Sequence, residues 1–162
     1  MKRLPMPYIC LLLALANIAY AGELPNPAFT PGVARDVTKE QLCTTSTKLV
    51  RHTTAQTKTD VYAEYGITPR HALECTGPGH ACYEIDHVIA LEIGGADVKE
   101  NLWPQEYEVV PTDPTWQKNG AHLKDSLENR LHKNICDGTT AIADAQACIA
   151  TDWIKCYARV MP

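Results

Sequence analysis

The sequence predicts an α+β fold that is helix-rich in its second half and stapled by disulfides. Two short apolar runs with strand character, Cys82–Ile89 and Asn101–Gln105, lie near the middle of the chain. After them, large apolar residues recur at helical spacing as far as Gly138, and again from Ala141 onward. The third observation is an even number of cysteines downstream of a predicted export signal, which is typical of disulfide-bonded exported proteins.

Residues 1–21 are predicted to be a cleaved signal peptide. Lys2 and Arg3 form a basic start, a mostly apolar run follows, and Ala19 and Ala21 are small residues at the two positions that a signal peptidase reads. The apolar run is too short for a stable transmembrane helix. We therefore expect a secreted or periplasmic protein of about 140 residues, a length that suits one domain, residues 22–162, with one core.

Six cysteines remain after the signal: Cys43, Cys75, Cys82, Cys136, Cys148 and Cys156. A Cys43–Cys136 bond would join the N-terminal part to the end of the main helix, and Cys75 and Cys82 could close a local loop. Cys148 and Cys156 would lie roughly 12 Å apart in one unbroken helix. That is too far for a disulfide, so we expect longer-range partners for them. A zinc site is the alternative, but the chain has no Cys-x-x-Cys pair.

The elements before the first strand are predicted to be short. Residues 22–37 are rich in Pro, Gly and Asn and favour an extended N-terminal arm. Thr38 and Gln41 form a capping-box pattern that indicates a short helix. The threonine-rich stretch 44–57 favours an exposed strand or loop pair, and Asp60–Tyr65 suits a single helical turn.

The second half is predicted to form two helices. The first begins with Asp113 as N-cap and Pro114 at the first helical position. It ends before Gly138 and carries one apolar stripe made of Trp116, Leu123, Leu127, Leu131 and Ile135. The second helix is expected to run without a break from Ala141 to about Tyr157.

Asp86 and His87 stand side by side at the end of the first predicted strand. A Gly94-Gly95 turn follows, and Asn101 comes fourteen residues after His87 and opens the second strand. A carboxylate and a neutral imidazole can together hold a hard divalent cation and activate a water beside it. The Asn side chain has one acceptor and two donors, with which it can pin the loop. Taken alone, an Asp-His pair would equally suit a turn cap.

Together with the helix downstream, these residues resemble the HNH (ββα-metal) nuclease family, whose core is two short strands and a helix around one metal ion. The resemblance covers roughly residues 84–132. It looks closest to exported bacterial proteins that have Trp-Pro after the Asn and Lys-Asp-x-x-Glu on the helix, here Lys124, Asp125 and Glu128. The resemblance implies that His87 is the general base, that Asp86 is a metal ligand and that Asn101 orders the loop and orients His87. It also implies a divalent metal ion, with Mg²⁺ or Mn²⁺ expected first and Zn²⁺ or Ca²⁺ as alternatives.

The chain departs from this family at the third site residue. Many members supply a His or Asn from the helix nine residues after the middle Asn, and that position is Val110 here. Asn119 and His122 are the candidate replacements as metal ligands, although His122 equally suits a solvated surface position. Lys124 is a candidate for binding substrate phosphate, with an ordinary salt bridge to Glu128 at i+4 as the alternative.

The function expected from this resemblance is an exported metal-dependent endonuclease with little sequence specificity, acting on DNA or alternatively RNA. Without the signal, however, the chain carries 13 basic and 19 acidic residues, a net charge of −6. Most proteins that bind DNA through its phosphates show a basic footprint. The charge therefore favours an alternative, a non-catalytic extracellular binding module on the same scaffold, and a structural Ca²⁺ domain is a third possibility. In each case we expect a monomer without membrane contact after signal cleavage.

Overall fold

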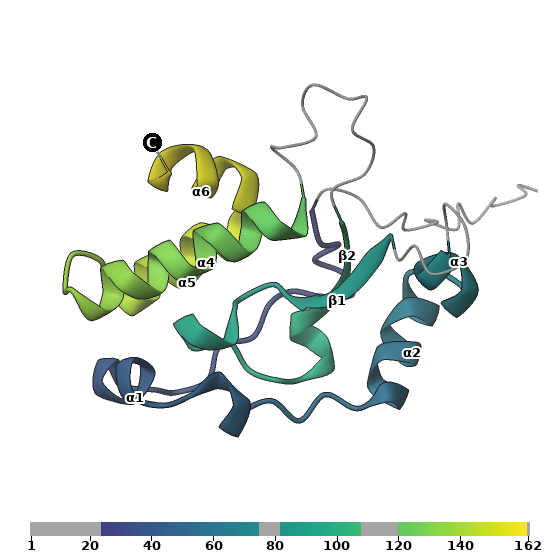
Figure 1. The fold of residues 1–162 in the computed structure, drawn as a ribbon, viewed down its shortest axis with the longest axis horizontal. Helices are drawn as coiled ribbons and strands as arrows, with labels where there is room; N and C mark the ends of the chain where they lie inside the picture. Colours follow the sequence, from purple (N-terminus) through teal and green to yellow (C-terminus); the bar gives the residue numbers. More distant parts are fainter. Residues whose placement is uncertain (1–23, 75–81, 108–119, 162) are drawn as a thin grey trace, which may run out of the picture.

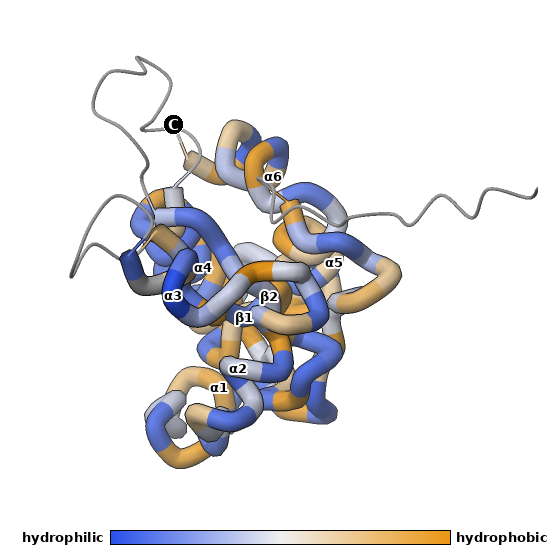
Figure 2. The backbone as a smooth tube through the Cα atoms, turned by 90° about the vertical axis from the view of Figure 1, so that its right-hand side faces the viewer, coloured by the Kyte–Doolittle hydropathy of each residue, from blue (hydrophilic) through white to orange (hydrophobic). Residues whose placement is uncertain are grey.

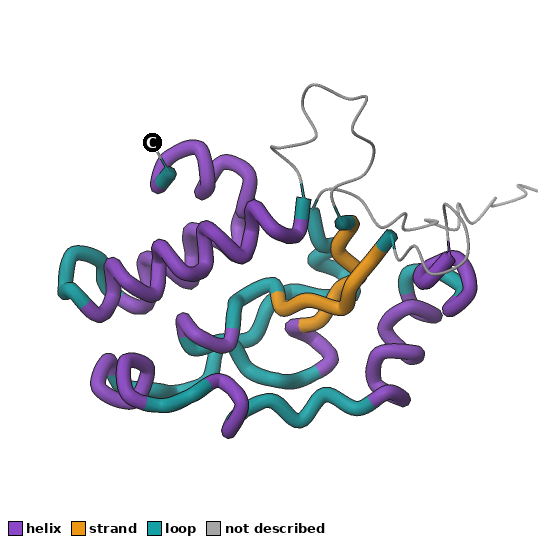
Figure 3. The backbone as a smooth tube through the Cα atoms, viewed as in Figure 1, coloured by secondary structure: helices purple, strands orange, loops and turns teal. Residues whose placement is uncertain are grey.

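The structure is a computed structural model that describes residues 24–74, 82–107 and 120–161. Within these ranges, helices flank a two-stranded sheet (Figure 1 and Figure 3). The predicted α+β class is confirmed at this level. The predicted signal peptide and the predicted helix start at Asp113-Pro114 lie outside the described residues.

The extended arm leads directly into a capped helix. Helix α1, Lys39–Thr44, begins after the N-cap residue Thr38. The backbone N–H of Thr38 donates to the Gln41 side chain, and the N–H of Gln41 donates to the Thr38 hydroxyl. The predicted capping box is therefore confirmed.

The threonine-rich stretch after α1 differs from the prediction. It forms a 3₁₀ turn, η1, Thr47–Leu49, and then the start of helix α2, Ala55–Glu64, which is longer than the single turn expected. Thr54 is the N-cap of α2, and its hydroxyl accepts a hydrogen bond from the N–H of Thr57. Threonine is common in strands but is also a favoured N-cap residue, and here the capping role prevails. Helix α3, Pro69–Glu74, follows α2.

The two predicted strands are both present. Strand β1, Tyr83–His87, and strand β2, Leu102–Glu106, pair antiparallel along their whole length. The loop that joins them contains two 3₁₀ turns, η2, Leu91–Ile93, and η3, Lys99–Asn101. The sheet therefore consists of one hairpin with a long, structured connection.

Helix α4, Ala121–Cys136, covers this loop and contacts η2 (Figure 1). Its buried face includes Leu127, Leu131 and Ile135, three members of the predicted apolar stripe. The helix ends before Gly138, whose φ of 78° lies in the left-handed region that favours glycine.

The second predicted helix is in fact two helices, α5, Ile142–Thr151, and α6, Trp153–Val160. Asp152 separates them with an extended backbone, φ −168° and ψ 96°. Its carboxylate caps α6 by accepting a hydrogen bond from the N–H of Lys155. An Asp side chain can bond to backbone N–H groups that a continuous helix would use, and so favours the start of a new helix over continuation of the old one.

The break between α5 and α6 makes one disulfide bond possible. Cys148 and Cys156 come to a Cα separation of 5.4 Å and form a bond, so the expectation of longer-range partners was wrong. The error came from the assumption of one unbroken helix. The Cys43–Cys136 bond, one of the pairings that the sequence allowed, is present with a Cα separation of 5.8 Å and joins α1 to the end of α4.

Cys82, directly before β1, is also disulfide-bonded. Cys75 lies outside the described residues, so a local Cys75–Cys82 bond stays a prediction. No helix in the described part of the chain is long and apolar enough to span a membrane.

The core gathers where β2, α2, α4 and the two last helices meet. Trp103 of β2 and Trp153 of α6 are its largest fully buried apolar side chains. Figure 2 shows hydrophobic stretches beside β2 and also in α1, α5 and α6, whereas α3 is hydrophilic. Both strands anchor the hairpin, because Ile85 of β1 also lies in the core, while Asp86 of β1 keeps 17% of its side chain exposed.

Gly95 is required where the loop after η2 passes close to the end of β1. A Cβ at this position would lie 1.7 Å from the carbonyl oxygen of Ile89. We expect Gly95→Ala to lower the free energy of unfolding by on the order of 4 kcal/mol. The control Gly66→Ala has φ 71° and nothing within 4 Å, so only the backbone strain of about 1–2 kcal/mol applies. Urea unfolding measures both, and equal losses would contradict the close approach.

Candidate functional site

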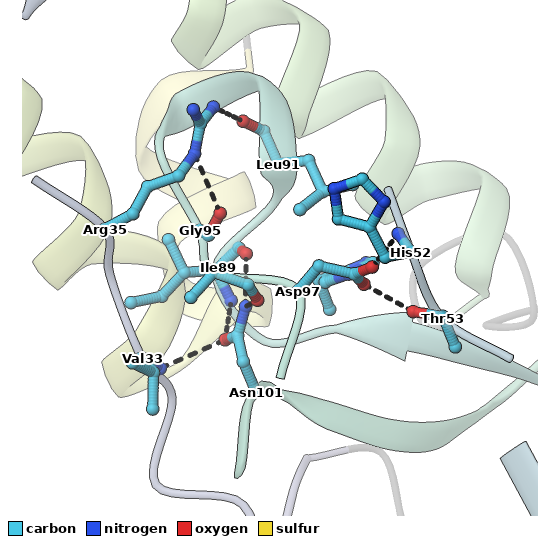
Figure 4. Close-up of polar contacts among 11 residues, drawn as sticks. Val33, Arg35, His52, Thr53, Ile89, Leu91, Gly95, Asp97 and Asn101 are labelled. Atoms are coloured by element: carbon cyan, nitrogen blue, oxygen red, sulfur yellow. Dashed lines mark hydrogen bonds and ion pairs between the residues drawn. The ribbon is translucent and has the colours of Figure 1, made fainter. Parts of the chain in front are cut away.

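Asn101 is the centre of the loop between β1 and β2. Its side chain is completely buried. Its Oδ1 accepts hydrogen bonds from the N–H groups of Ile89 (3.0 Å) and Val33 (3.2 Å), and its Nδ2 donates to the carbonyls of Ile89 (2.9 Å) and Ala96 (2.8 Å) (Figure 4). Both donors and both acceptor positions of the amide are used. The prediction that Asn101 pins this loop is confirmed.

Arg35 of the N-terminal arm holds the same loop from outside. Its Nε donates to the carbonyl of Gly95 (3.2 Å) and its Nη2 donates to the carbonyl of Leu91 (3.0 Å) (Figure 4). Ala34 pairs with Gly95 in an isolated antiparallel bridge. The arm is therefore part of the site's support. Sequence reasoning missed Arg35, because an isolated Arg in a Pro- and Gly-rich segment has no pattern that marks it.

Asp86 and His87 use different partners, as expected for consecutive residues of a strand. Oδ2 of Asp86 accepts a hydrogen bond from Nζ of Lys124 on α4 (2.6 Å). Nε2 of His87 is hydrogen-bonded to Oδ1 of Asp97 in the loop (2.8 Å). The two side chains are still close enough for the Asp86 charge to oppose the lowering of the His87 pKa that burial causes.

Asp97 joins the His87 ring to the segment before α2. Besides His87, its carboxylate accepts hydrogen bonds from the backbone N–H of His52 and the hydroxyl of Thr53 (Figure 4). Burial alone would raise the pKa of the Asp97 carboxyl, but these three hydrogen bonds lower it to about 2. Asp97 is therefore ionised at neutral pH and can only accept protons in hydrogen bonds. It was not among the predicted site residues, and its position between Gly-Gly and Asn101 is the signal that would have indicated it.

The protonation of His87 follows from these contacts. Burial lowers the pKa of His87, and the nearby charge of Arg51 adds to this effect, while Asp97 and Asp86 oppose it. The neutral ring then carries its proton on Nε2, which donates to Asp97, and leaves Nδ1 with a lone pair. The His87 side chain is only 2% exposed.

Lys124 is a buried cation between β1 and α4. Only 1% of its surface is exposed. Its Nζ donates to Asp86 Oδ2 (2.6 Å), to the carbonyl of His87 (2.7 Å) and to Glu128. Burial acts to lower the pKa of Lys124, but the two carboxylates outweigh it and raise the pKa.

All three donors of this ammonium are used inside the protein. The predicted substrate-binding role of Lys124 does not fit this position, because a phosphate would have to displace one of its partners. The alternative, a salt bridge with Glu128, is present. The same ammonium fixes the Asp86 carboxylate and the His87 backbone relative to α4.

Further acidic groups lie near Asp86. Burial and the Asp86 charge raise the pKa of Glu84 on β1 and of Asp125 on α4. Glu84 also accepts a hydrogen bond from the hydroxyl of Tyr107 (3.0 Å). His122 is exposed, and its Nδ1 lies 3.8 Å from Asp125. The predicted ligand His122 thus lies beside Asp125 at an exposed position, as its alternative of a solvated surface residue expects, while Asn119 lies outside the described residues.

The donors near Asp86 suit a hard divalent cation in their chemistry. Carboxylate oxygens are the ligands that Mg²⁺, Mn²⁺ and Ca²⁺ prefer. Lys124 uses Oδ2 of Asp86, and no hydrogen bond in the described ranges uses Oδ1. A closed ligand set is not formed, however. Among the described residues, Asp86 belongs to no group of three His, Cys, Asp or Glu side chains whose ligand atoms lie within 4.8 Å of one another.

No protein-family model, no curated protein and no solved structure matches this chain.

The hydrogen bonds to Asp97 predict a specific pH dependence of stability. A carboxyl whose folded-state pKa lies below its unfolded value of about 4 stabilises the fold above that pH, and this contribution disappears as the pH falls towards 2. A pKa of about 2 corresponds to roughly 2–3 kcal/mol. Asp97→Asn is expected to lose about this amount at pH 7, and its difference from wild type should shrink between pH 5 and pH 2.

Chemical unfolding across this pH range measures the effect of Asp97→Asn. Asp36→Asn, at an exposed position of the arm, is the control and should leave the free energy of unfolding nearly unchanged. A wild-type-to-variant difference that is the same at pH 7 and pH 2 would argue against an ionised Asp97.

The Lys124 contacts predict a large effect of removing the buried ammonium. Lys124→Met keeps the length of the side chain but leaves Asp86 and Glu128 without their cation, which should cost about 3–5 kcal/mol. Lys133→Met is the matched control on the same helix. Lys133 forms an i,i+4 pair with Asp137, but both side chains are at least half exposed, so a loss below about 1 kcal/mol is expected. Thermal or urea unfolding distinguishes the two, and similar losses would refute the buried-cation role.

Proposed function

We propose that this protein is an exported, metal-dependent endonuclease of the HNH type that hydrolyses phosphodiester bonds of DNA. The observation that carries the proposal is the pinned loop after β1. Asn101 fixes the backbone that follows the Asp86-His87 pair, and Lys124 fixes the pair itself from α4. A carboxylate and an imidazole held in this way are preorganised for hydrolysis.

His87 is the general base of the proposed reaction. Its lowered pKa keeps the ring neutral at neutral pH, and the ionised Asp97 holds the proton on Nε2. Nδ1 then accepts a proton from the attacking water. Asp97 would hold the tautomer and orientation of the ring throughout.

Asp86 is the principal ligand for the divalent cation. Oδ1 remains for the ion, with Glu84, Asp125 and His122 as the nearby donors, and binding would relieve the repulsion that raises the pKa values of the two neighbouring carboxyls. When bound, the ion supplies positive charge to the phosphate in the transition state. Lys124 would keep Asp86 in place during this step.

Local positive charge for the nucleic-acid backbone lies in a groove between α2 and β1. The groove has a volume of about 450 Å³, and its lining includes Arg51, Lys58, Tyr62, Tyr83 and Tyr107. Arg51 is also close enough to His87 to lower its pKa. The two cations suit the phosphates and the tyrosine rings suit the bases of a nucleic acid strand, and Glu84 is the acidic residue in the lining. This groove supplies the local binding that an acidic protein needs.

A non-catalytic binding module is the second candidate. The burial of His87 and the open ligand set around Asp86 favour it. Calorimetric titration with Mn²⁺ separates the two functions, because only the nuclease requires a metal affinity that falls in Asp86→Asn.

The proposal predicts cleavage of plasmid DNA by protein that lacks residues 1–21, in the presence of Mg²⁺ or Mn²⁺, with Zn²⁺ and Ca²⁺ as comparison ions. His87→Ala is expected to lower the rate by at least about 100-fold, the range that a general base contributes. His71→Ala, an exposed histidine of α3, is the matched control and should cleave at the wild-type rate. Equal activity of wild type and a folded His87→Ala variant would overturn the catalytic assignment.

A further inference from the structure

Three potential metal ligands meet where α1 approaches the end of α4. Sγ of Cys43, Nε2 of His132 and Sγ of Cys136 lie within 4.8 Å of one another, and no other described residues form such a group. In the oxidised protein the two cysteines form the disulfide that joins α1 to α4. The function proposed above uses none of these three residues.

The ligand atoms are positioned by helices α1 and α4, whose own hydrogen bonds and caps do not depend on the disulfide or on an ion. His132 and Cys136 are four residues apart on α4 and therefore share one helix face. Their ligand atoms lie 3.5 Å apart. A tetrahedral ion with a metal–sulfur distance of about 2.3 Å and a metal–nitrogen distance of about 2.1 Å separates such atoms by about 3.6 Å. The existing spacing already suits one edge of the tetrahedron.

Cys43 is held near this edge by the rest of α1. The capping box fixes the start of α1, and the side chain of Leu42 is buried in the core. Nε2–H of His132 donates a hydrogen bond to the carbonyl of Leu42 (3.2 Å), so Nε2 binds an ion only when this bond is given up and the ring proton moves to Nδ1. The capping box and the buried Leu42 side chain would keep Cys43 beside His132 after the disulfide opens. Cys43 is exposed, so that a reductant and an ion can reach it.

We propose that Cys43, His132 and Cys136 form a redox-gated site for a soft divalent ion of the zinc class. Two equivalents of a thiol reductant give two electrons and two protons to the disulfide, so that the Cys43–Cys136 bond breaks, two cysteine thiols form and the reductant becomes its own disulfide. The ion then binds both sulfurs as thiolates, two protons pass to solvent, and neutral His132 completes three protein ligands through Nε2. The ion takes over the link between α1 and α4 that the disulfide provides in the oxidised protein.

Cobalt(II) titration tests the site, because a thiolate–cobalt bond gives a charge-transfer absorption band. The protein without residues 1–21 is reduced with a trialkylphosphine, which contributes no thiolate. A background with Cys75, Cys82, Cys148 and Cys156 replaced by Ser leaves Cys43 and Cys136 as the only cysteines after residue 21, so that no other thiolate can give the band. We expect one cobalt ion per reduced chain with a thiolate band, and no band in the oxidised chain. His132→Ala should weaken binding by at least about 100-fold, whereas His71→Ala should not change it.

A stability measurement tests the same site if the reduced chain loses its structure in the absence of an ion. Zn²⁺ is expected to raise the melting temperature of the reduced protein, or to restore its helical circular dichroism, but to leave the oxidised protein and reduced His132→Ala unaffected. Absence of a thiolate band in the reduced chain would overturn the proposal. Equal cobalt affinity with and without His132 would also overturn it. Neither outcome bears on nuclease activity, which is measured separately on the oxidised protein.

Discussion

The buried amide of Asn101 is the interaction on which the site depends. The loop between β1 and β2 passes through the interior, where unpaired backbone groups would cost free energy. One side chain satisfies backbone groups of the loop at Ile89 and Ala96 and of the arm at Val33. Because the arm and the loop share this partner, the position of His87 and Asp97 relative to each other rests on contacts more than sixty residues apart in the chain.

Lys124 provides the second constraint, from the opposite side of β1. A single ammonium lies between two carboxylates and a carbonyl in a water-poor position. Such an arrangement is stable only when every partner is present, since a buried charge without compensation is strongly destabilising. The Lys124 contacts allow the polar end of β1, Asp86 and the His87 carbonyl, to pack against α4. The same contacts leave one oxygen of Asp86 for another ligand, which is the geometric basis of the proposed metal site.

Local sequence signals predicted much of this architecture. The capping box at Thr38 and Gln41, both strands and the apolar face of α4 were predicted from short patterns and agree with the structure. The errors occurred where a residue type suits two local structures. Threonines that favour strands cap α2 instead, and Asp152 begins a new helix inside a helical pattern. In each case a free helix N-terminus was the deciding partner.

By itself, the sequence determined which residues could carry chemistry: Asp86, His87 and Asn101 in order, and the spacing that lets an amide close the loop between two strands. Only the tertiary structure decided the partners of these residues. It paired His87 with Asp97, committed Lys124 to Asp86, and brought Cys43 to His132. The reason is that hydrogen bonds and ion pairs of buried groups depend on distances across the fold, and short-range patterns of residue type contain no information about those distances.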